Sequence, residues 1–117
     1  MNSVRFHAEA RAELIHEVGF YTAVSRRLGE RFDMEVKSAV NRASEFPALG
    51  SPYFFETRRV FPKKFHFSIV YLTLGTEVFI VAIAPESRKP GYWRSRVGSG
   101  RPSGYPTRPP TEPDVPN

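Results

Sequence analysis

Residues 65–84, FHFSIVYLTLGTEVFIVAIA, decide the fold, because two apolar stretches surround a short turn. Residues 65–73 and 77–84 are rich in Phe, Val, Ile and Tyr, the side chains that pack well on a pleated sheet. Residues 74–76 between them are few enough for a tight hairpin. We therefore expect two antiparallel strands here, and residues 55–60 predict a third strand before them.

The chain before these strands has the apolar spacing of helices. Apolar side chains recur three or four residues apart from Ala10 to Tyr21, which predicts an amphipathic helix within residues 7–27. A second helix is expected over residues 30–46, with Gly29 at the break between the two. The two helices would form a hairpin with an apolar face to bury.

The order of the elements predicts an α+β fold. Val4 and Phe6 suggest a short N-terminal strand, so the chain runs from one strand through two helices to three strands. No helix separates the later strands, and a parallel crossover between them would need one. We expect a small antiparallel sheet, made of one N-terminal and three C-terminal strands, packed on the helical hairpin.

The length and composition allow one folded domain. The 117 residues, 40% of them hydrophobic, can build a single core. From Gly98 to Asn117 the chain holds six of the eleven prolines and one aliphatic residue, Val115. Such a segment buries too little apolar surface to become ordered. We predict a domain over residues 1–97 and a disordered Pro/Gly-rich tail over residues 98–117.

The sequence contains no stretch suited to a membrane or to export. The longest apolar run, 78–84, has seven residues, whereas a membrane-spanning helix needs about 20. The N-terminal MNSVRFHAEA lacks the apolar stretch of a secretory signal. With no cysteine, the chain has no disulfide, thiolate metal site or cysteine nucleophile. We expect a cytoplasmic protein.

Side chains for metal or acid–base chemistry are not grouped in the sequence. The histidines fall on a predicted strand end, a helix and a strand, without the spacing of a metal site: His7, His16 and His66. Glutamates repeat every four residues along the first helix and are interpreted as a solvated face: Glu9, Glu13 and Glu17. A Gly-rich phosphate loop and a nucleophile elbow are also missing, so we expect neither metal nor cofactor.

The net charge of +5 is concentrated in the second half of the predicted domain. Residues 1–57 hold seven Lys and Arg against eight Asp and Glu, whereas residues 58–97 hold eight against two. The eight cations are Arg58, Arg59, Lys63, Lys64, Arg88, Lys89, Arg94 and Arg96. In an antiparallel sheet these positions can converge on one rim, whose field would attract an anionic partner such as nucleic acid or an acidic protein.

The only tryptophan, Trp93, follows Tyr92 and is flanked by basic residues. Aromatic rings beside arginine can stack on unpaired bases. They can also anchor the chain end against the helical hairpin, which is the commoner role of a single tryptophan in a small domain. Trp93 therefore has a packing and a binding interpretation.

Four features occur in one order within residues 3–96. They are the strand, two-helix, three-strand order, the double arginine at 58–59, the pattern Phe67-x-Ile69-x-Tyr71 and the closing pattern Arg88-x-Pro90-x-x-Trp93. In this order and spacing they resemble the RelE/ParE superfamily of bacterial toxins.

This resemblance implies the toxin of a type II toxin–antitoxin system of the plasmid-stabilisation kind, which inhibits growth and is neutralised by a cognate antitoxin. RelE-like members cut messenger RNA in the ribosome, whereas ParE-like members inhibit DNA gyrase and are not nucleases. Ser68 stands about where the nuclease branch presents an arginine, and the Tyr92-Trp93 ending is more similar to the ParE branch. We therefore expect a ParE-like protein that binds its target without chemistry on it.

The basic rim and the resemblance together indicate the functional residues. For binding of a target such as DNA gyrase, they are Arg58, Arg59, Arg88, Lys89 and Trp93. For the alternative, an mRNA endonuclease that depends on the ribosome, they are Arg59, Arg88 and Tyr92. A third alternative is a degenerate member that binds its antitoxin and DNA but is not toxic.

Overall fold

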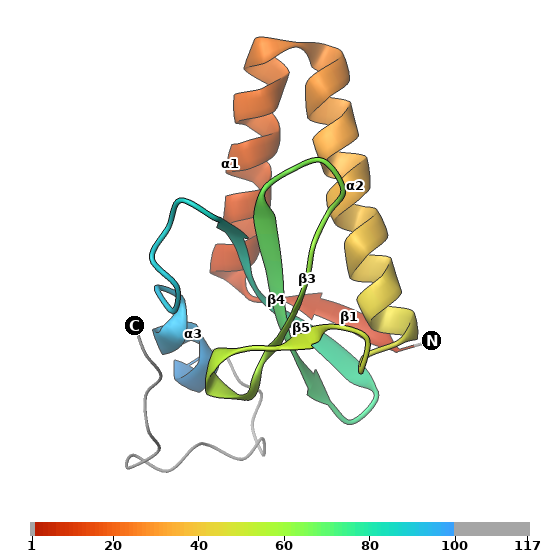
Figure 1. The fold of residues 1–117 in the computed structure, drawn as a ribbon, viewed down its shortest axis with the longest axis vertical. Coiled ribbons are helices and arrows are strands. Elements are labelled where there is room, and N and C mark those ends of the chain that lie inside the picture. Colours follow the sequence, from red (N-terminus) through yellow and green to blue (C-terminus); the bar gives the residue numbers. More distant parts are fainter. Residues whose placement is uncertain (1, 100–117) are drawn as a thin grey trace.

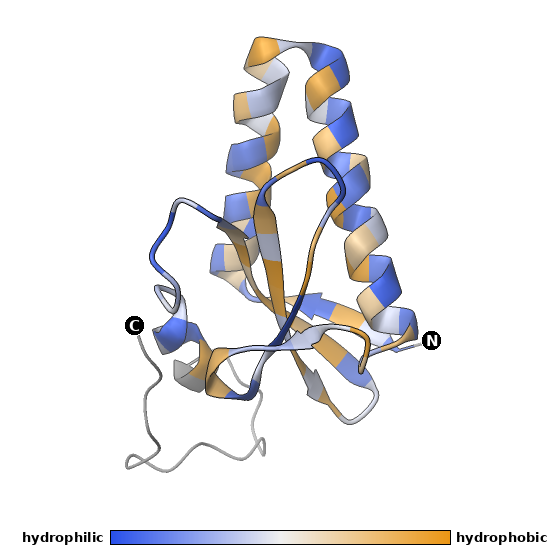
Figure 2. Ribbon diagram, viewed as in Figure 1, coloured by the Kyte–Doolittle hydropathy of each residue, from blue (hydrophilic) through white to orange (hydrophobic). Residues whose placement is uncertain are grey.

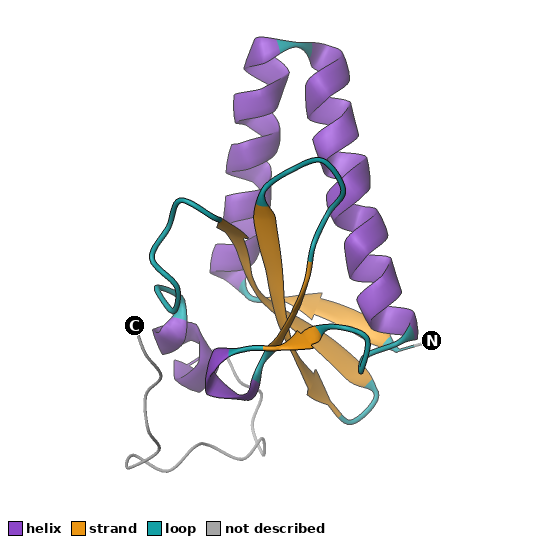
Figure 3. Cartoon of the chain, viewed as in Figure 1, coloured by secondary structure: helices purple, strands orange, loops and turns teal. Residues whose placement is uncertain are grey.

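The computed structural model describes residues 2–99 of the chain (Figure 1 and Figure 3). Its elements are, in order, β1 (Ser3–Phe6), α1 (Ala8–Val24), α2 (Arg26–Glu45), β2 (Ser51–Pro52), a 3₁₀ turn (Phe54–Glu56), β3 (Arg58–Val60), β4 (Phe67–Leu74), β5 (Glu77–Pro85) and α3 (Arg94–Ser99). The predicted order of one strand, two helices and three strands is present, and β2 and α3 are additions to it. The predicted tail lies outside the described residues from position 100 onward.

The five strands form one sheet in the order β1-β5-β4-β3-β2. The α+β class and the helical hairpin are confirmed. The sheet is mixed, however, because β1 pairs with β5 in parallel, from Ser3 opposite Glu77 to Phe6 opposite Ile80, while the other pairs are antiparallel. The expectation of an antiparallel N-terminal strand was wrong, since the chain leaves β1 through two helices and no tight turn fixes its direction.

The helical hairpin breaks at Ser25, four residues before the predicted break at Gly29. Ser25 has extended backbone angles, φ −161° and ψ 145°, and its hydroxyl accepts a hydrogen bond from the N–H of Leu28, as an N-cap does. Gly29 lies inside α2, where a Cβ atom would meet Thr22 of α1. The glycine therefore serves helix packing.

The predicted strand over residues 55–60 exists only from Arg58 onward. The residues before it form the 3₁₀ turn, in which Phe55 and Glu56 have φ of 61° and 62°. The hydroxyl of Thr57 closes this turn by donating to the carbonyl of Phe54 at 2.6 Å. A left-handed backbone at two consecutive residues ends strand pairing, which explains the shorter β3.

The sheet has a hydrophobic core on each face. On one face α1 and α2 cover the sheet, with the buried side chains of Phe32 and Val36 packed against those of Ile69 and Ile80. On the other face Trp93 and its neighbours pack on a second cluster of strand side chains. Figure 2 shows the apolar colour along β4, the central strand that contributes to both faces. The C-terminal segment thus closes the face that the helical hairpin leaves open.

Candidate functional site

A pocket of about 420 Å³ opens on the sheet face opposite the helical hairpin. Its lining includes three cations, Arg59, Arg88 and Lys89, and one carboxylate, that of Glu86. The cations come from β3 and from the loop after β5, two segments that the antiparallel sheet brings together. The pocket therefore has an excess of positive charge in a partly enclosed space, where water screens charges less than on an open surface.

Arg59 is held in this pocket by aromatic rings and one hydrogen bond. Its guanidinium carbon lies 4.0 Å from the ring centre of Tyr53 and 5.1 Å from that of Phe61. Nη1 donates to the hydroxyl oxygen of Ser68 at 3.2 Å. Nε is buried and has no hydrogen-bond partner among the described residues. Ring contacts on a rigid strand limit the rotamers of this guanidinium, so its donors are presented in a narrow set of directions.

Arg88 and Lys89 add two cations at the rim of the pocket. Both side chains are exposed. The guanidinium carbon of Arg88 lies 3.9 Å from the ring centre of Tyr92, and its backbone N–H donates to the carbonyl of Pro85 at 3.0 Å. The loop thus holds one guanidinium against a ring and leaves the neighbouring ammonium in solvent. The three residues predicted for nuclease activity, Arg59, Arg88 and Tyr92, all line this pocket.

Two members of the predicted target-binding set are not available to a partner there. Arg58 is next to Arg59 on a strand and so points to the opposite face, where Nη1 donates to the carbonyl oxygens of Gly50 at 2.6 Å and Ala48 at 3.4 Å. It stabilises the loop before β2. Trp93 is 1% exposed and belongs to the second core cluster. The burial expected of Trp93 is confirmed, but the expected packing against the helical hairpin was wrong, because Trp93 packs on the sheet face opposite the hairpin. We therefore do not place Arg58 and Trp93 in the binding set.

The predicted convergence of eight cations on a single rim was wrong. Arg59, Arg88 and Lys89 meet at the pocket, whereas Lys64 lines a different depression. The guanidinium carbon of Arg94 lies 5.2 Å from the ring centre of Phe55. Arg58 faces away from Arg59 because side chains alternate along a strand, and Arg96 pairs with Glu13.

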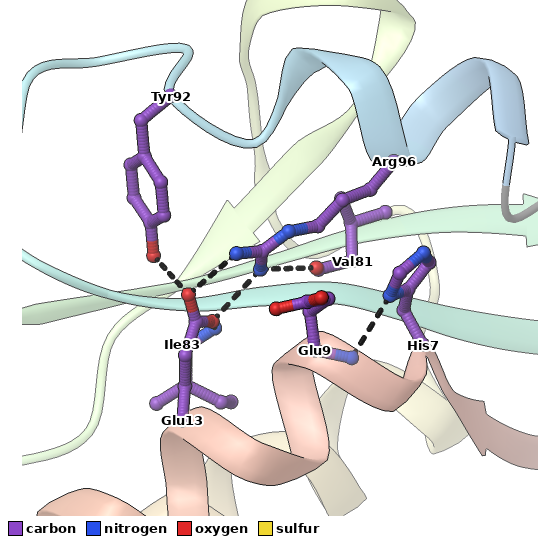
Figure 4. Close-up of polar contacts among 7 residues, drawn as sticks. All are labelled: His7, Glu9, Glu13, Val81, Ile83, Tyr92 and Arg96. Atoms are coloured by element: carbon purple, nitrogen blue, oxygen red, sulfur yellow. Dashed lines mark hydrogen bonds and ion pairs between the residues drawn. The ribbon is translucent and has the colours of Figure 1, made fainter.

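Arg96 is committed to a buried ion pair with Glu13 of α1 (Figure 4). Nη1 lies 2.9 Å from Oε1 and Nη2 lies 2.8 Å from Oε2, a two-contact geometry. The side chains are only 12% and 18% exposed. The interpretation of Glu13 as part of a solvated face was wrong, because the C-terminal segment folds over this part of α1.

The Glu13–Arg96 pair covers the free edge of β5. The strand β1 ends at Phe6, whose partner is Ile80, so β5 continues without a neighbour on that side. There Glu13 Oε1 accepts the N–H of Ile83 at 3.0 Å, and Arg96 Nη1 donates to the carbonyl of Val81 at 3.2 Å (Figure 4). A carboxylate thus faces the free donor and a guanidinium faces the free acceptor. The two side chains replace the missing strand.

Tyr92 completes this network. Its hydroxyl donates to Glu13 Oε2 at 2.7 Å. Burial raises the pKa of Tyr92 above its usual value, and the hydrogen bond to Glu13 and the charge of that carboxylate raise the pKa further, while Arg96 and Arg88 oppose the shift. The hydroxyl is therefore protonated at neutral pH and is already used as a donor.

His7 begins α1 close to the same network. Its Nδ1 accepts the backbone N–H of Glu9 at 3.0 Å, which caps the helix (Figure 4). Burial lowers the pKa of His7, and the positive charge of Arg96 lowers it further, while Glu9 and Glu13 oppose the shift. The neutral imidazole is thus favoured, as the accepting Nδ1 requires.

Sequence reasoning missed Glu13, Arg96 and the serine–arginine contact in the pocket. Glu13 precedes the buried Leu14 and follows the buried Ala10 by three residues, so it lies at the border of the apolar stripe of α1. That position was the available signal for a carboxylate in contact with another element. Arg96 lies in a helix of only six residues, which is too short for an apolar stripe to show in the sequence which side chains are buried.

Residues 2–99 contain neither a membrane-spanning helix nor a cluster of metal ligands. Neither α1 nor any other helix there is both long and apolar enough to span a membrane. Within the same range, no three side chains of His, Asp or Glu come together as a metal site would require.

Comparison with known proteins assigns the fold and the family. A solved structure described as the chromosomal ParDE toxin–antitoxin system from P. aeruginosa has a similar fold, with a TM-score of 0.63 and 17% sequence identity over 73% of this chain and 96% of that chain. No curated protein matches the chain. The family model described as ParE toxin of the type II toxin–antitoxin system parDE matches residues 4–90. The chain therefore belongs to the ParE toxin family of type II toxin–antitoxin systems.

Proposed function

We propose that this ParE-family toxin inhibits growth in the cytoplasm by binding DNA gyrase and that a cognate antitoxin neutralises it. The observation that carries a binding mode of action is the pocket with Arg59, Arg88 and Lys89. A group of cations, one on a strand and two on the loop after β5, suits recognition of an anionic surface. The choice of gyrase as the target follows from the resemblance to the ParE branch.

The state of Tyr92 supports binding over RNA cleavage. Cleavage at a 2′-hydroxyl needs a group that takes a proton and another that gives one to the leaving oxygen. Tyr92 was the hydroxyl predicted for this chemistry, but its proton is directed to Glu13. Ser68 lies beside Arg59 and adds no fixed charge to hold a phosphate. One observation favours the nuclease alternative: Arg59, Arg88 and Tyr92 line the same pocket.

Neutralisation by an antitoxin is the second part of the proposal. The same excess of cations that would attract the target would attract an acidic segment of the antitoxin. An antitoxin that folds on this surface would compete with the target for it. The antitoxin would then be expected to weaken the toxin in proportion to its occupancy of the pocket.

Induced expression tests the target. Cells that make the toxin should stop growing and form filaments, and the purified protein should inhibit supercoiling by gyrase, while full-length messenger RNA persists. Rapid loss of full-length messenger RNA with active gyrase would instead identify a nuclease. Unchanged growth at normal toxin levels would identify the non-toxic alternative. Co-expression of the protein from the adjacent reading frame tests neutralisation.

A pair of double charge reversals tests the pocket. Arg88→Glu with Lys89→Glu should abolish growth inhibition, because the change reverses the charge at the pocket rim, and both side chains are exposed, so the core should stay intact. The control is Arg26→Glu with Arg27→Glu, which makes the same change of net charge at two exposed positions at the start of α2. Equal toxicity of the two variants would show that the pocket is not the site of action.

A further inference from the structure

The pocket presents hydrogen-bond donors in excess of acceptors. Arg59 contributes an Nε that has no hydrogen-bond partner within residues 2–99, and Arg88 and Lys89 contribute charged N–H groups at the rim. Ser68 is 5% exposed, and its oxygen accepts from Arg59, which leaves its proton free to be donated. Glu86 is the one carboxylate in the lining. Such a set is complementary to an acceptor-only group, which is an oxyanion.

The buried Nε of Arg59 marks where that oxyanion would bind. Buried N–H groups in folded proteins nearly always have an acceptor, and an exception asks for a cause. The rings of Tyr53 and Phe61 restrain the guanidinium, so the edges of its plane remain for hydrogen bonding. Arg59 lines the pocket, so an oxyanion that enters it comes beside the guanidinium in the orientation that these rings hold. A guanidinium edge of this kind matches two oxygens of one oxyanion.

The aromatic side chains of the pocket are poorly placed to stack on bases. The ring of Tyr53 has the guanidinium of Arg59 at 4.0 Å, and the ring of Tyr92 has that of Arg88 at 3.9 Å. Trp93 is 1% exposed. Recognition of unpaired nucleic acid relies on exposed ring faces, which these contacts occupy. The surroundings therefore favour an oxyanion without an attached base.

We propose that the pocket binds the side-chain carboxylate of an Asp or Glu from a partner protein, with Arg59 as the principal contact, Ser68 as a donor beside it and Arg88 at the rim. The proposal deepens the proposed function, since a protein target and a protein antitoxin would both present such carboxylates. It assigns to Arg59 a role in recognition that Arg58, on the other face, cannot share.

Titration of the full-length protein with a synthetic peptide of alternating Glu and Gly tests this proposal. The single Trp93 in the pocket wall reports binding by its fluorescence, and backbone amide shifts locate the peptide. The matched peptide with Gln for Glu should not bind. A single-stranded RNA of equal charge should bind more weakly than the Glu peptide and should not perturb Tyr53 or Tyr92. Tighter binding of the RNA at these residues would overturn the proposal.

Three variants test which arginines bind the Glu peptide. Arg59→Lys keeps the charge and removes the guanidinium edge, so affinity for the Glu peptide should fall at least about fivefold. Arg88→Gln should also weaken binding, whereas its control Arg31→Gln, at an exposed arginine of α2, should not. Retained near-ultraviolet circular dichroism shows that each variant is folded. Equal effects of Arg88→Gln and Arg31→Gln, or full affinity of folded Arg59→Lys, would refute the pocket.

The two proposals fail in different ways. If gyrase is inhibited and Arg59→Lys changes neither inhibition nor peptide binding, the carboxylate site is wrong and the proposed function remains. If the Glu peptide binds through Arg59 but gyrase and growth are unaffected, the site is right and the proposed target is wrong.

Discussion

Gly29 of α2 lies so close to Thr22 of α1 that a Cβ atom on the glycine would be 2.0 Å from Oγ1 and 2.9 Å from Cα of the threonine. Replacement by alanine must therefore separate the two helices. We expect Gly29→Ala to lower the free energy of unfolding by about 2 kcal/mol, as overpacking does. Denaturation with urea measures the change.

Gly19 supplies the control for this prediction. It is exposed in α1, and a Cβ there has no neighbour within 4 Å. Gly19→Ala should raise the free energy of unfolding by about 0.5–1 kcal/mol through helix propensity alone. If both variants were stabilised, the close packing at Gly29 would be disproved.

Glu13→Gln should destabilise the protein by about 3 kcal/mol, because it leaves the guanidinium of Arg96 desolvated and without its counter-charge. Glu17→Gln, one turn further along α1, should change stability by less than about 0.5 kcal/mol. Chemical denaturation of both variants gives the comparison. Similar effects at the two positions would mean that the Glu13–Arg96 contact contributes little.

The raised pKa of Tyr92 gives the protein a stability that is lost at high pH. Below the unfolded-state pKa of about 10 the hydroxyl is protonated in both states, and this stability is fully present. As the pH rises past 10, the unfolded state loses its proton first and folding becomes less favourable. The free energy of unfolding should therefore decrease between about pH 9.5 and pH 11.

Tyr92→Phe isolates this contribution. The variant loses the hydrogen bond to Glu13 at every pH but should show a shallower decrease above about pH 10 than the wild type. Tyr21 and Tyr71 also have pKa values raised by burial, so some decrease persists in the variant. Parallel stability curves for the two proteins would contradict the assignment of the titration to Tyr92.

Trp93→Ala should lower the free energy of unfolding by about 4 kcal/mol, since Trp93 is 1% exposed within the second core cluster. Phe46→Ala provides the matched case of a large aromatic residue that is 63% exposed, and it should be nearly neutral. Thermal unfolding of both variants checks the difference. A neutral Trp93→Ala would return this residue to the target-binding set.

The elements that could be predicted from the sequence are those with a repeated local pattern. Apolar runs rich in Phe, Val, Ile and Tyr on either side of a short turn predicted β4 and β5, and a spacing of three or four predicted α1 and α2. The direction of β1 could not be predicted in this way, because its partner in β5 is more than seventy residues distant, as the pairing of Ser3 with Glu77 shows. Parallel pairing across such a separation leaves no local signal.

The site could be predicted in part, for equally physical reasons. Arg59, Arg88 and Lys89 were expected at a functional surface and do line one pocket. The separation of Arg58 from Arg59 follows from strand alternation and was available in the sequence. The burial of Arg96 could not be predicted from the sequence, because it depends on the path by which the chain after β5 reaches α1.

The distance along the chain between Glu13 and Arg96, 83 residues, has a consequence during translation. The helical hairpin and all five strands leave the ribosome first, and Arg96 follows near the end of the described chain. Tyr92 and Trp93, which line the pocket with Arg59, Arg88 and Lys89, can pack on the sheet only after β5 is in place. A nascent chain that stops before Tyr92 therefore carries the scaffold of the toxin without the finished pocket.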